Sequence, residues 1–198
     1  EPVKQINANL TASDDYSVVK RLAENFGIGF EGIKKNGPFE ITQAQASALL
    51  AASTENKNGR PNSDVVKPWV NGQELMRRTE RLWLIDFGID TPVEIAAGYT
   101  KPFQYVEQVV KPVRMKSNDK QLRTYWWLFE RPRPPMRAAI QKLSRYIVTP
   151  RVAKHRIFVW LDANIVPDGR LNVFTRADDY FFGTLQAKPH TLWALKYA

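Results

Sequence analysis

The sequence of 198 residues contains no cysteine and only two histidines. Without cysteine, the chain can form neither a disulfide framework nor a thiolate metal site. His155 and His190 stand 35 positions apart, which is a poor spacing for a zinc site. The sequence also lacks any apolar run near the ~20 residues that a membrane-spanning helix requires. These absences favour a cytoplasmic protein with no metal site and no membrane partner.

The beginning of the chain lacks the features of a natural start. The residues EPVKQINANL contain no methionine, no basic leader region and no apolar leader core, so they are not a signal peptide. We therefore expect a fragment of a longer protein. A chain of this length can bury roughly 70% of its unfolded surface, and 43% of the residues are hydrophobic, so we expect one compact unit with its own core.

The glycines of GIGFEG, at positions 27–32, have the spacing of a G-x-G-x-x-G phosphate loop. That loop follows a strand and opens a helix. Here Val18, Leu22 and Phe26 indicate a helix before it, and the residues after it have no helical period. The pattern therefore predicts a helix that ends at Gly27 and an extended segment with small residues. We expect no cofactor to bind this chain.

Basic residues are concentrated in one part of the chain. The formal net charge is +9, but the stretch from Lys101 to Arg156 alone has fourteen Lys or Arg against three acidic residues, a net charge of +11. Aromatic residues are interleaved there, as in RTYWWLFERPRPPMR. Such a stretch attracts polyanions, and nucleic acid is the leading candidate. The alternatives are a solvated basic face and a scaffold that docks an acidic protein.

Local signals predict the order of the elements. Thr42 and Gln45 form a capping box for a helix, 54–64 is expected to be an exposed loop, and KPFQYVEQVV can form one or two helical turns before Pro112. Pro68 places DVVKPWV at a sheet edge, and LWLIDFG is typical of a buried strand. Later short runs predict an antiparallel meander closed by a short helix in PHTLWALKY: RYIVTP, RIFVWLD, RLNVFTR and FFGTLQ. The expected class is α+β, with N-terminal helices, a mainly antiparallel sheet, a basic helical insertion and a short C-terminal helix.

Two pairs in the basic stretch suggest contacts. Arg133 and Arg137 are four residues apart and repel each other unless a partner such as phosphate neutralises them. Trp126 and Trp127 are adjacent, so we expect one in the core and the other covering it or stacking on a ligand. Three carboxylates, Asp168, Asp178 and Asp179, offer an alternative function as a Mg²⁺-dependent nuclease, although their sequence context favours turns.

Six ordered blocks resemble one protein family. They are GFEGIKKNGPFEI, DVVKPWVNGQEL, LWLIDFG, WWLFERPRPPMR, RYIVTPRVAKHRIFVWL and DDYFFGTLQAKPHTLWAL. In this order they resemble the C-terminal half of large bacterial adenine-specific DNA methyltransferases, including the MmeI-like fused restriction and modification enzymes. The resemblance implies a non-catalytic target recognition domain for double-stranded DNA in the bacterial cytoplasm. It also implies a methyltransferase domain of the same parent chain, absent here, that uses S-adenosylmethionine.

The resemblance implies roles for individual segments. Residues 1–60 would link from the absent catalytic domain, and residues 61–198 would form the main body. Residues in TPRVAKHR and FGTLQAKPH would reach base edges, a role that their donors and acceptors suit: Arg151, Lys154, His155, Arg156, Gln186 and Lys188. Other cations are assigned to phosphates: Lys34, Lys35, Lys111, Arg114, Lys116, Lys120, Arg123, Arg131, Arg133 and Arg137.

Overall fold

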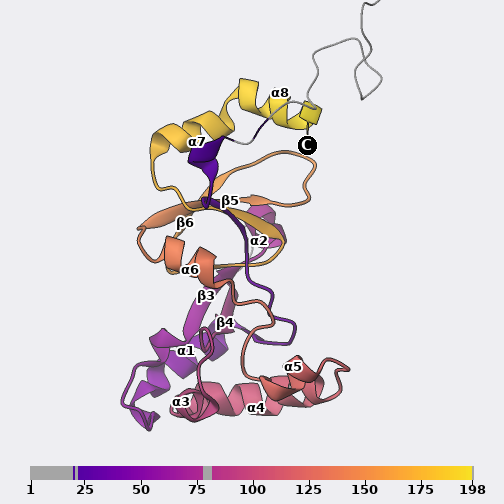
Figure 1. The fold of residues 1–198 in the computed structure, drawn as a ribbon. Coiled ribbons are helices and arrows are strands. Elements are labelled where there is room, and N and C mark those ends of the chain that lie inside the picture. Colours follow the sequence, from indigo (N-terminus) through magenta and orange to yellow (C-terminus); the bar gives the residue numbers. More distant parts are fainter. Residues whose placement is uncertain (1–19, 21, 78–81, 198) are drawn as a thin grey trace, which may run out of the picture.

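The computed structural model describes residues 20, 22–77 and 82–197, which form two four-stranded sheets with helices around them (Figure 1). Sheet I is antiparallel and has the order β1 (Gly29–Glu31), β8 (Leu171–Phe174), β5 (Arg145–Pro150) and β6 (Val159–Asp162). Sheet II has the order β2 (Glu40–Ile41), β4 (Leu82–Ile85), β3 (Val66–Val70) and β7 (Val166–Pro167), and its β3–β7 pair is parallel. The predicted α+β class with mainly antiparallel sheets is confirmed.

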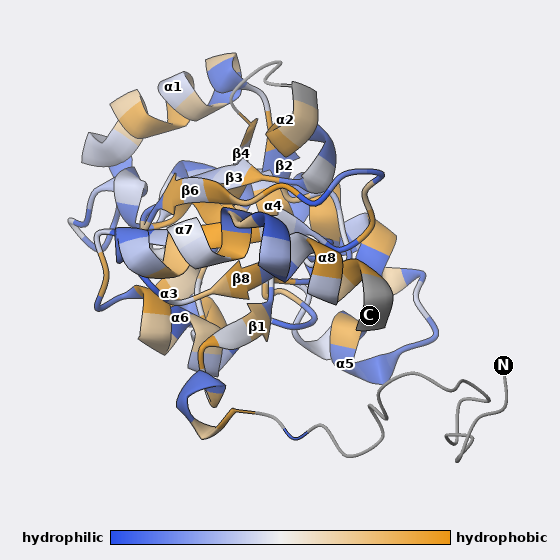
Figure 2. Ribbon diagram, turned by 90° about the horizontal axis from the view of Figure 1, so that it is seen from above, coloured by the Kyte–Doolittle hydropathy of each residue, from blue (hydrophilic) through white to orange (hydrophobic). Residues whose placement is uncertain are grey.

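The helices divide between the two sheets (Figure 1). Four lie around sheet II: α1 (Gln43–Ala51), α3 (Val93–Ala97), α4 (Thr100–Met115) and α5 (Lys120–Thr124). Two short helices lie near the middle, α2 (Gly72–Arg77) and α6 (Pro134–Ile140), while α7 (Asp179–Gln186) and α8 (Lys188–Tyr197) lie across the outer face of sheet I (Figure 2). Short 3₁₀ turns occur at Ala23–Asn25, Ala52–Glu55 and Asn62–Asp64. Within the described ranges, no helix is long and apolar enough to cross a membrane.

One hydrophobic core runs through both sheets. It includes Tyr146 and Val148 of sheet I and Leu84 of sheet II, all fully buried. Side chains alternate along a strand, so Ile147 faces the other side of sheet I, where it packs with Phe158 and with Leu185 of α7. Alternate side chains of β5 therefore pack in the main core on one face of sheet I and against α7 on the other face.

Trp126 and Trp127 both belong to the main core, with ring centroids 5.8 Å apart. The prediction that one of them covers the core or stacks on a ligand is wrong. They lie in a turn after α5 rather than in a helix or a strand, so adjacent side chains can enter the same core.

The helix predicted before Gly27 lies largely in residues 1–19 and 21, outside the described residues. Its described end is the turn Ala23–Asn25, and Gly27 has a φ of +75°, the left-handed conformation that glycine adopts readily. Strand β1 follows, as predicted. The capping box is confirmed, because Thr42 Oγ1 accepts from the Gln45 amide at 3.2 Å and Gln45 Oε1 accepts from the Thr42 amide at 2.8 Å.

Two predictions near the N-terminal half are wrong. The stretch 54–64 is not an exposed loop throughout, because Asn56 and Asn62 are buried and Asn56 Nδ2 donates to Asn62 Oδ1 at 2.7 Å. Strand β3 is not an edge strand, because it lies between β4 and β7. Pro68 is still tolerated, since the ladder with β7 begins only at the next residue.

Three later predictions also need correction. Helix α4 does not end before Pro112 but continues to Met115. FFGTLQ is part of α7 rather than a strand, because the Asp178 side chain caps that helix by accepting from the Phe181 amide at 2.8 Å. The strands do not form a simple meander, since β8 pairs with β5 and β7 joins sheet II. The division of the chain at residue 60 stays a prediction.

Candidate functional site

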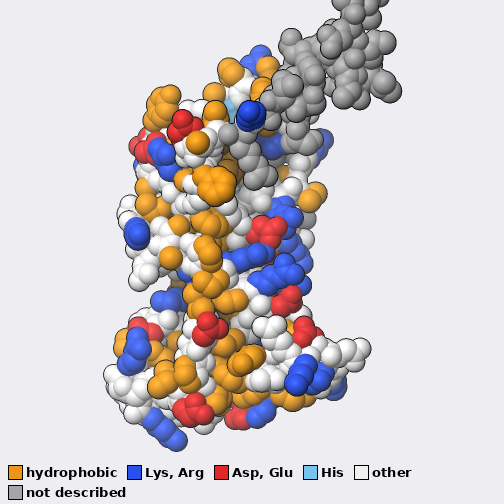
Figure 3. Space-filling view, viewed as in Figure 1, with side chains coloured by type: hydrophobic (Ala, Val, Ile, Leu, Met, Phe, Trp, Pro, Cys, Tyr) orange, Lys and Arg blue, Asp and Glu red, His pale blue; other side chains and the backbone are white. Residues whose placement is uncertain are grey.

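A cleft of about 560 Å³ lies where the chain passes from sheet I to sheet II. We call it the basic cleft, because six cations line it: Lys34, Lys35, Arg131, Arg133, Arg151 and Arg170. Three carboxylates share the lining, those of Glu31, Glu40 and Asp168. Basic and acidic side chains are seen together at the narrow middle of the molecule (Figure 3). The structure thus brings five of the predicted site residues together.

Backbone pairing builds the cleft from segments that are far apart in sequence. The segment after β1 bonds on one side to the turn before β8, where the Ile33 amide donates to the Pro167 carbonyl at 2.9 Å. On the other side, Lys34 and Arg131 exchange amide–carbonyl bonds at 3.1 and 3.0 Å. The cations of the cleft therefore lie on a fixed backbone frame.

Internal carboxylates orient several of these cations. Glu31 pairs with Arg133 and, at 2.9 Å, with Arg151. Lys35 Nζ lies 2.7 Å from a Glu40 carboxylate oxygen and 3.8 Å from the centroid of the Trp69 ring, which adds a cation–π contact. These ion pairs orient the cations, but the three carboxylates of the lining do not neutralise all six cations of the cleft.

Exposure separates the cations that can meet a ligand from those that support the cleft. The side chains of Lys34, Arg131, Arg151 and Arg170 are 53%, 58%, 48% and 82% exposed, respectively. Those of Lys35 and Arg133 are only 10% and 28% exposed. A bound anion would therefore meet the first four. Arg170 was not among the predicted site residues. The sequence indicates a turn at Asp168 and Gly169, but it does not show that this turn brings the next side chain, that of Arg170, to the cleft.

Glu130 belongs to the strip Glu130–Pro132, which precedes α6, and it connects this strip to Lys34. Its carboxylate accepts from Lys34 Nζ and from Asn36 Nδ2, both at 2.7 Å. Burial raises the pKa of Glu130, but these hydrogen bonds and the nearby Arg131 outweigh burial, so its pKa lies below the usual 4.5. The carboxylate is therefore charged at neutral pH and keeps Lys34 oriented.

Two cations that we assigned to phosphates, Arg114 and Arg137, are paired inside the protein instead. Arg114 is 2% exposed, and its guanidinium donates to the carbonyls of Lys35, Asn36 and Tyr125. Burial lowers the pKa of Arg114 to about 10, so it remains charged at neutral pH. Arg137 pairs with the buried Asp86 at 2.7 Å. The repulsion expected between Arg133 and Arg137 is thus relieved by Glu31 and Asp86 rather than by phosphate.

The remaining predicted phosphate contacts lie on α4, directly after it at Lys116, and on α5. Lys111 pairs with Glu107 at 2.8 Å and lies over the Trp126 ring, and Arg123 donates to the Ser117 carbonyl. Lys116 and Lys120 are exposed. None of these four side chains lines the basic cleft.

The predicted base-reading residues fall into two groups. Arg151 lines the basic cleft, whereas the others lie on the loop after β5 or at the α7–α8 junction. Gln186 Nε2 donates to the Phe158 carbonyl and Arg156 donates to the Ala194 carbonyl, both at 3.2 Å, so the loop is joined to the end of α7 and to α8. Lys154, His155 and Lys188 are exposed beside them.

The three carboxylates of the nuclease alternative do not gather at one point. Asp168 bonds to the Arg170 amide in its turn, Asp178 caps α7 and pairs with Arg176, and Asp179 pairs with Arg145. Across residues 20, 22–77 and 82–197, no group of three or more potential ligands could hold a metal ion. The arrangement therefore gives this alternative no support.

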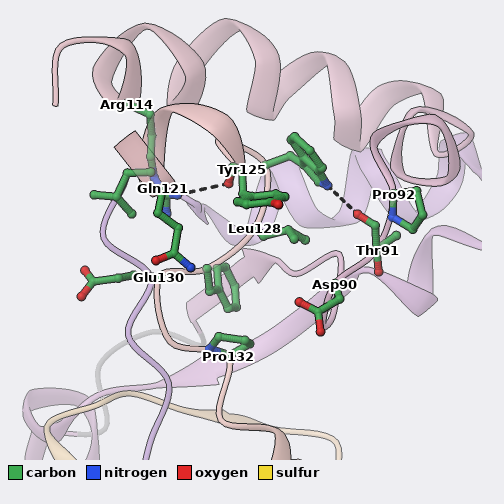
Figure 4. Close-up of a pocket in the computed structure, with 12 residues that line it drawn as sticks. Asp90, Thr91, Pro92, Arg114, Gln121, Tyr125, Leu128, Glu130 and Pro132 are labelled. Atoms are coloured by element: carbon green, nitrogen blue, oxygen red, sulfur yellow. Dashed lines mark hydrogen bonds between the residues drawn. The ribbon is translucent and has the colours of Figure 1, made fainter. Parts of the chain in front are cut away.

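A second cavity, of about 450 Å³, lies between α5 and the strip before α6 (Figure 4). Its walls include the half-exposed Tyr125, Pro132 and the amide of Gln121 (Figure 4). Trp127 donates to the Thr91 carbonyl at 2.8 Å, and Arg114 donates to the Tyr125 carbonyl, so both sides are fixed by hydrogen bonds (Figure 4). The pocket adjoins the basic cleft through the strip Glu130–Pro132.

No protein-family model matches this sequence, and no curated protein is similar to it in sequence. Among solved structures, the Type IIL restriction-modification enzyme MmeI in complex with DNA has a similar fold, with a TM-score of 0.67 and 16% sequence identity. The similarity covers 96% of this chain and 25% of the length of that protein. The chain therefore has the fold of one part of a restriction-modification enzyme.

Proposed function

We propose that this chain is a DNA-binding module that engages duplex DNA through the basic cleft. The observation that carries the proposal is the match in fold over nearly the whole chain to part of an enzyme solved with DNA. The chemistry of the cleft supports it, since Lys34, Arg131, Arg151 and Arg170 are exposed on a fixed frame at one place. Four oriented cations suit a run of phosphates, which fix a protein on the duplex.

The finer proposal is a target recognition domain of a bacterial adenine-specific DNA methyltransferase. In this function the chain selects the DNA sequence, and a catalytic domain of the parent protein binds S-adenosylmethionine and methylates the adenine. Two features support it: the six sequence blocks that resemble this family, and the exposed loop with Lys154 and His155 close to the α7–α8 junction.

The salt dependence of DNA binding tests the proposal. Each neutralised phosphate contributes about −0.9 to the slope of log affinity against log salt. The four exposed cations of the cleft alone predict roughly 10²-fold weaker binding at 200 mM than at 50 mM salt, and six or more contacts roughly 10³-fold. Fluorescence anisotropy with a labelled duplex measures this, and a flat titration contradicts the proposal.

Single substitutions locate the contact. Arg131→Ala and Arg170→Ala should each weaken binding and make the salt slope shallower by about one unit. Lys57→Ala is the matched control, because Lys57 is an exposed cation outside the cleft, and it should leave the slope unchanged. Equal effects of all three substitutions would mean that binding is spread over the surface and not concentrated in the cleft.

A further inference from the structure

Val152 is 94% exposed, the highest value among the exposed large hydrophobic residues of the described part of the chain. It lies on the loop that follows β5, next to Arg151 and shortly before Lys154. Single exposed apolar residues are common. Val152, however, lines a hollow of about 560 Å³ with other apolar groups, among them Pro150, Ala153 and the half-exposed Met76.

The apolar hollow and the basic cleft are neighbours. Arg151, Gly169 and Arg170 line both, so these residues form the ridge between them. A polyanion that lies in the cleft therefore passes directly beside the hollow. Gln73 of α2 lines the hollow but not the cleft, and it is an exposed residue whose side-chain amide makes no hydrogen bond to the described residues.

The chemistry of duplex DNA offers one apolar group at a base edge in the major groove, the C5-methyl group of thymine. Its partner adenine presents N6 and N7, which pair with the amide of glutamine or asparagine. A hollow with apolar walls and one free glutamine amide, reached past two arginines, has the donors and surfaces that an A·T pair requires.

We propose that this apolar hollow reads an A·T base pair, with Val152 and Met76 against the thymine methyl group and the Gln73 amide on the adenine edge. This inference rests on the proposed DNA binding. It adds residues that the resemblance did not assign, since Val152, Met76 and Gln73 come from the exposure and shape of the surface.

Removing the thymine methyl group tests the inference directly. A preferred duplex is first selected with the 198-residue chain from a randomised pool, and each of its thymines is then replaced in turn by deoxyuridine. Replacement at one position should weaken binding about fourfold, the effect of one methyl group returned to water. If every replacement leaves the affinity unchanged, or if no fixed position of the selected duplex is thymine, the inference is wrong.

A variant of the protein shows whether Val152 meets that methyl group. Val152→Ala should weaken binding to the thymine duplex severalfold but change binding to the matching deoxyuridine duplex by less than twofold, because the group that it contacts is already missing. Val113→Ala is the control, since Val113 is a half-exposed valine of α4 outside the hollow. Equal loss on both duplexes would contradict the contact.

Gln73→Ala tests the second half of the pair. It should reduce discrimination against other base pairs at the same position roughly tenfold, while binding elsewhere in the duplex is unaffected. Unchanged discrimination would remove Gln73 from the site. If the chain binds no duplex in a salt-dependent way, the proposed function fails and this inference falls with it; if it binds but ignores the methyl group, only the inference fails.

Discussion

Gly32, between the cleft residues Glu31 and Ile33, shows how closely two backbone segments approach each other. A Cβ atom on this residue would lie 2.0 Å from the carbonyl oxygen of Asp168 and 2.6 Å from that of Pro167. Both contacts are with backbone, which cannot rotate away as the end of a side chain can. The glycine of GIGFEG that a phosphate loop would use for a ligand is therefore used here to join β1 to the turn before β8.

Gly32→Ala should lower the free energy of unfolding by about 2–3 kcal/mol, because the β1 segment or the turn at Asp168 must shift to accept the methyl group. Gly29→Ala is the control, since a Cβ there meets nothing within 4 Å, and it should change stability by less than about 0.5 kcal/mol. Urea denaturation of both variants measures the difference. Equal stabilities would mean that the approach at Gly32 is not tight.

Arg114 was misassigned for a reason that its own helix makes clear. Val106, Val110 and Arg114 follow one another at intervals of four residues, and all three are buried along one face of α4. The prediction that helical turns end before Pro112 left Arg114 outside this pattern. Had the helix been continued, the spacing would have placed Arg114 in the core rather than on a DNA-binding surface.

Helix α4 contains Pro112 in its last turns, where proline removes a backbone hydrogen bond and crowds the carbonyl four residues earlier. Pro112 is exposed, so its ring adds little packing. Pro112→Ala should therefore raise the free energy of unfolding by about 1–2 kcal/mol, after allowance for the greater freedom of the unfolded chain.

Pro102 provides the comparison within the same helix. It lies in the first turn, where amide groups have no partner inside the helix, and it is buried. Pro102→Ala should therefore give no gain in stability. Thermal and urea unfolding distinguish the two variants, and a loss of stability on Pro112→Ala would contradict the continuous helix.

The elements that could be predicted from sequence are those with local causes. The capping box at Thr42 and the short β-rich run RYIVTP of β5 both act within a few residues, and both predictions are confirmed. The loop 54–64 was misjudged because Asn56 and Asn62 look solvated in sequence, although each is satisfied by a partner inside the fold. In the site, five of the six cations of the cleft could be named from the sequence, but not Arg170, and not that Glu31 joins Arg133 to Arg151.

At the scale of the whole molecule, a buried ion pair connects the parts around the two sheets. Asp86 follows β4 of sheet II, and Arg137 belongs to α6, which leads into sheet I. The Arg137 guanidinium lies 2.7 Å from the Asp86 carboxylate, whose side chain is 4% exposed. An uncompensated charge in such a place costs more than the pair contributes, so the two residues depend on each other.

Asp86→Asn should lower the free energy of unfolding by about 3 kcal/mol, because it leaves the Arg137 guanidinium without a counter-charge. Asp90→Asn is the control, since Asp90 is exposed on the same segment and should tolerate the change within about 0.5 kcal/mol. Equilibrium urea denaturation measures both. If removing Asp86 costs no more than removing Asp90, the pair does not hold the two parts together.

The pairing of β1 with β8 has a consequence for how the chain acquires its structure. Gly29 of β1 lies opposite Phe174 of β8, so β1 has no partner on this side until β8 has been synthesised. On a ribosome, sheet I cannot form completely until β8 has emerged, and contacts between such distant segments form slowly. During synthesis β1 is an unpaired edge, and a chain that stops before residue 171 would keep it exposed to other chains.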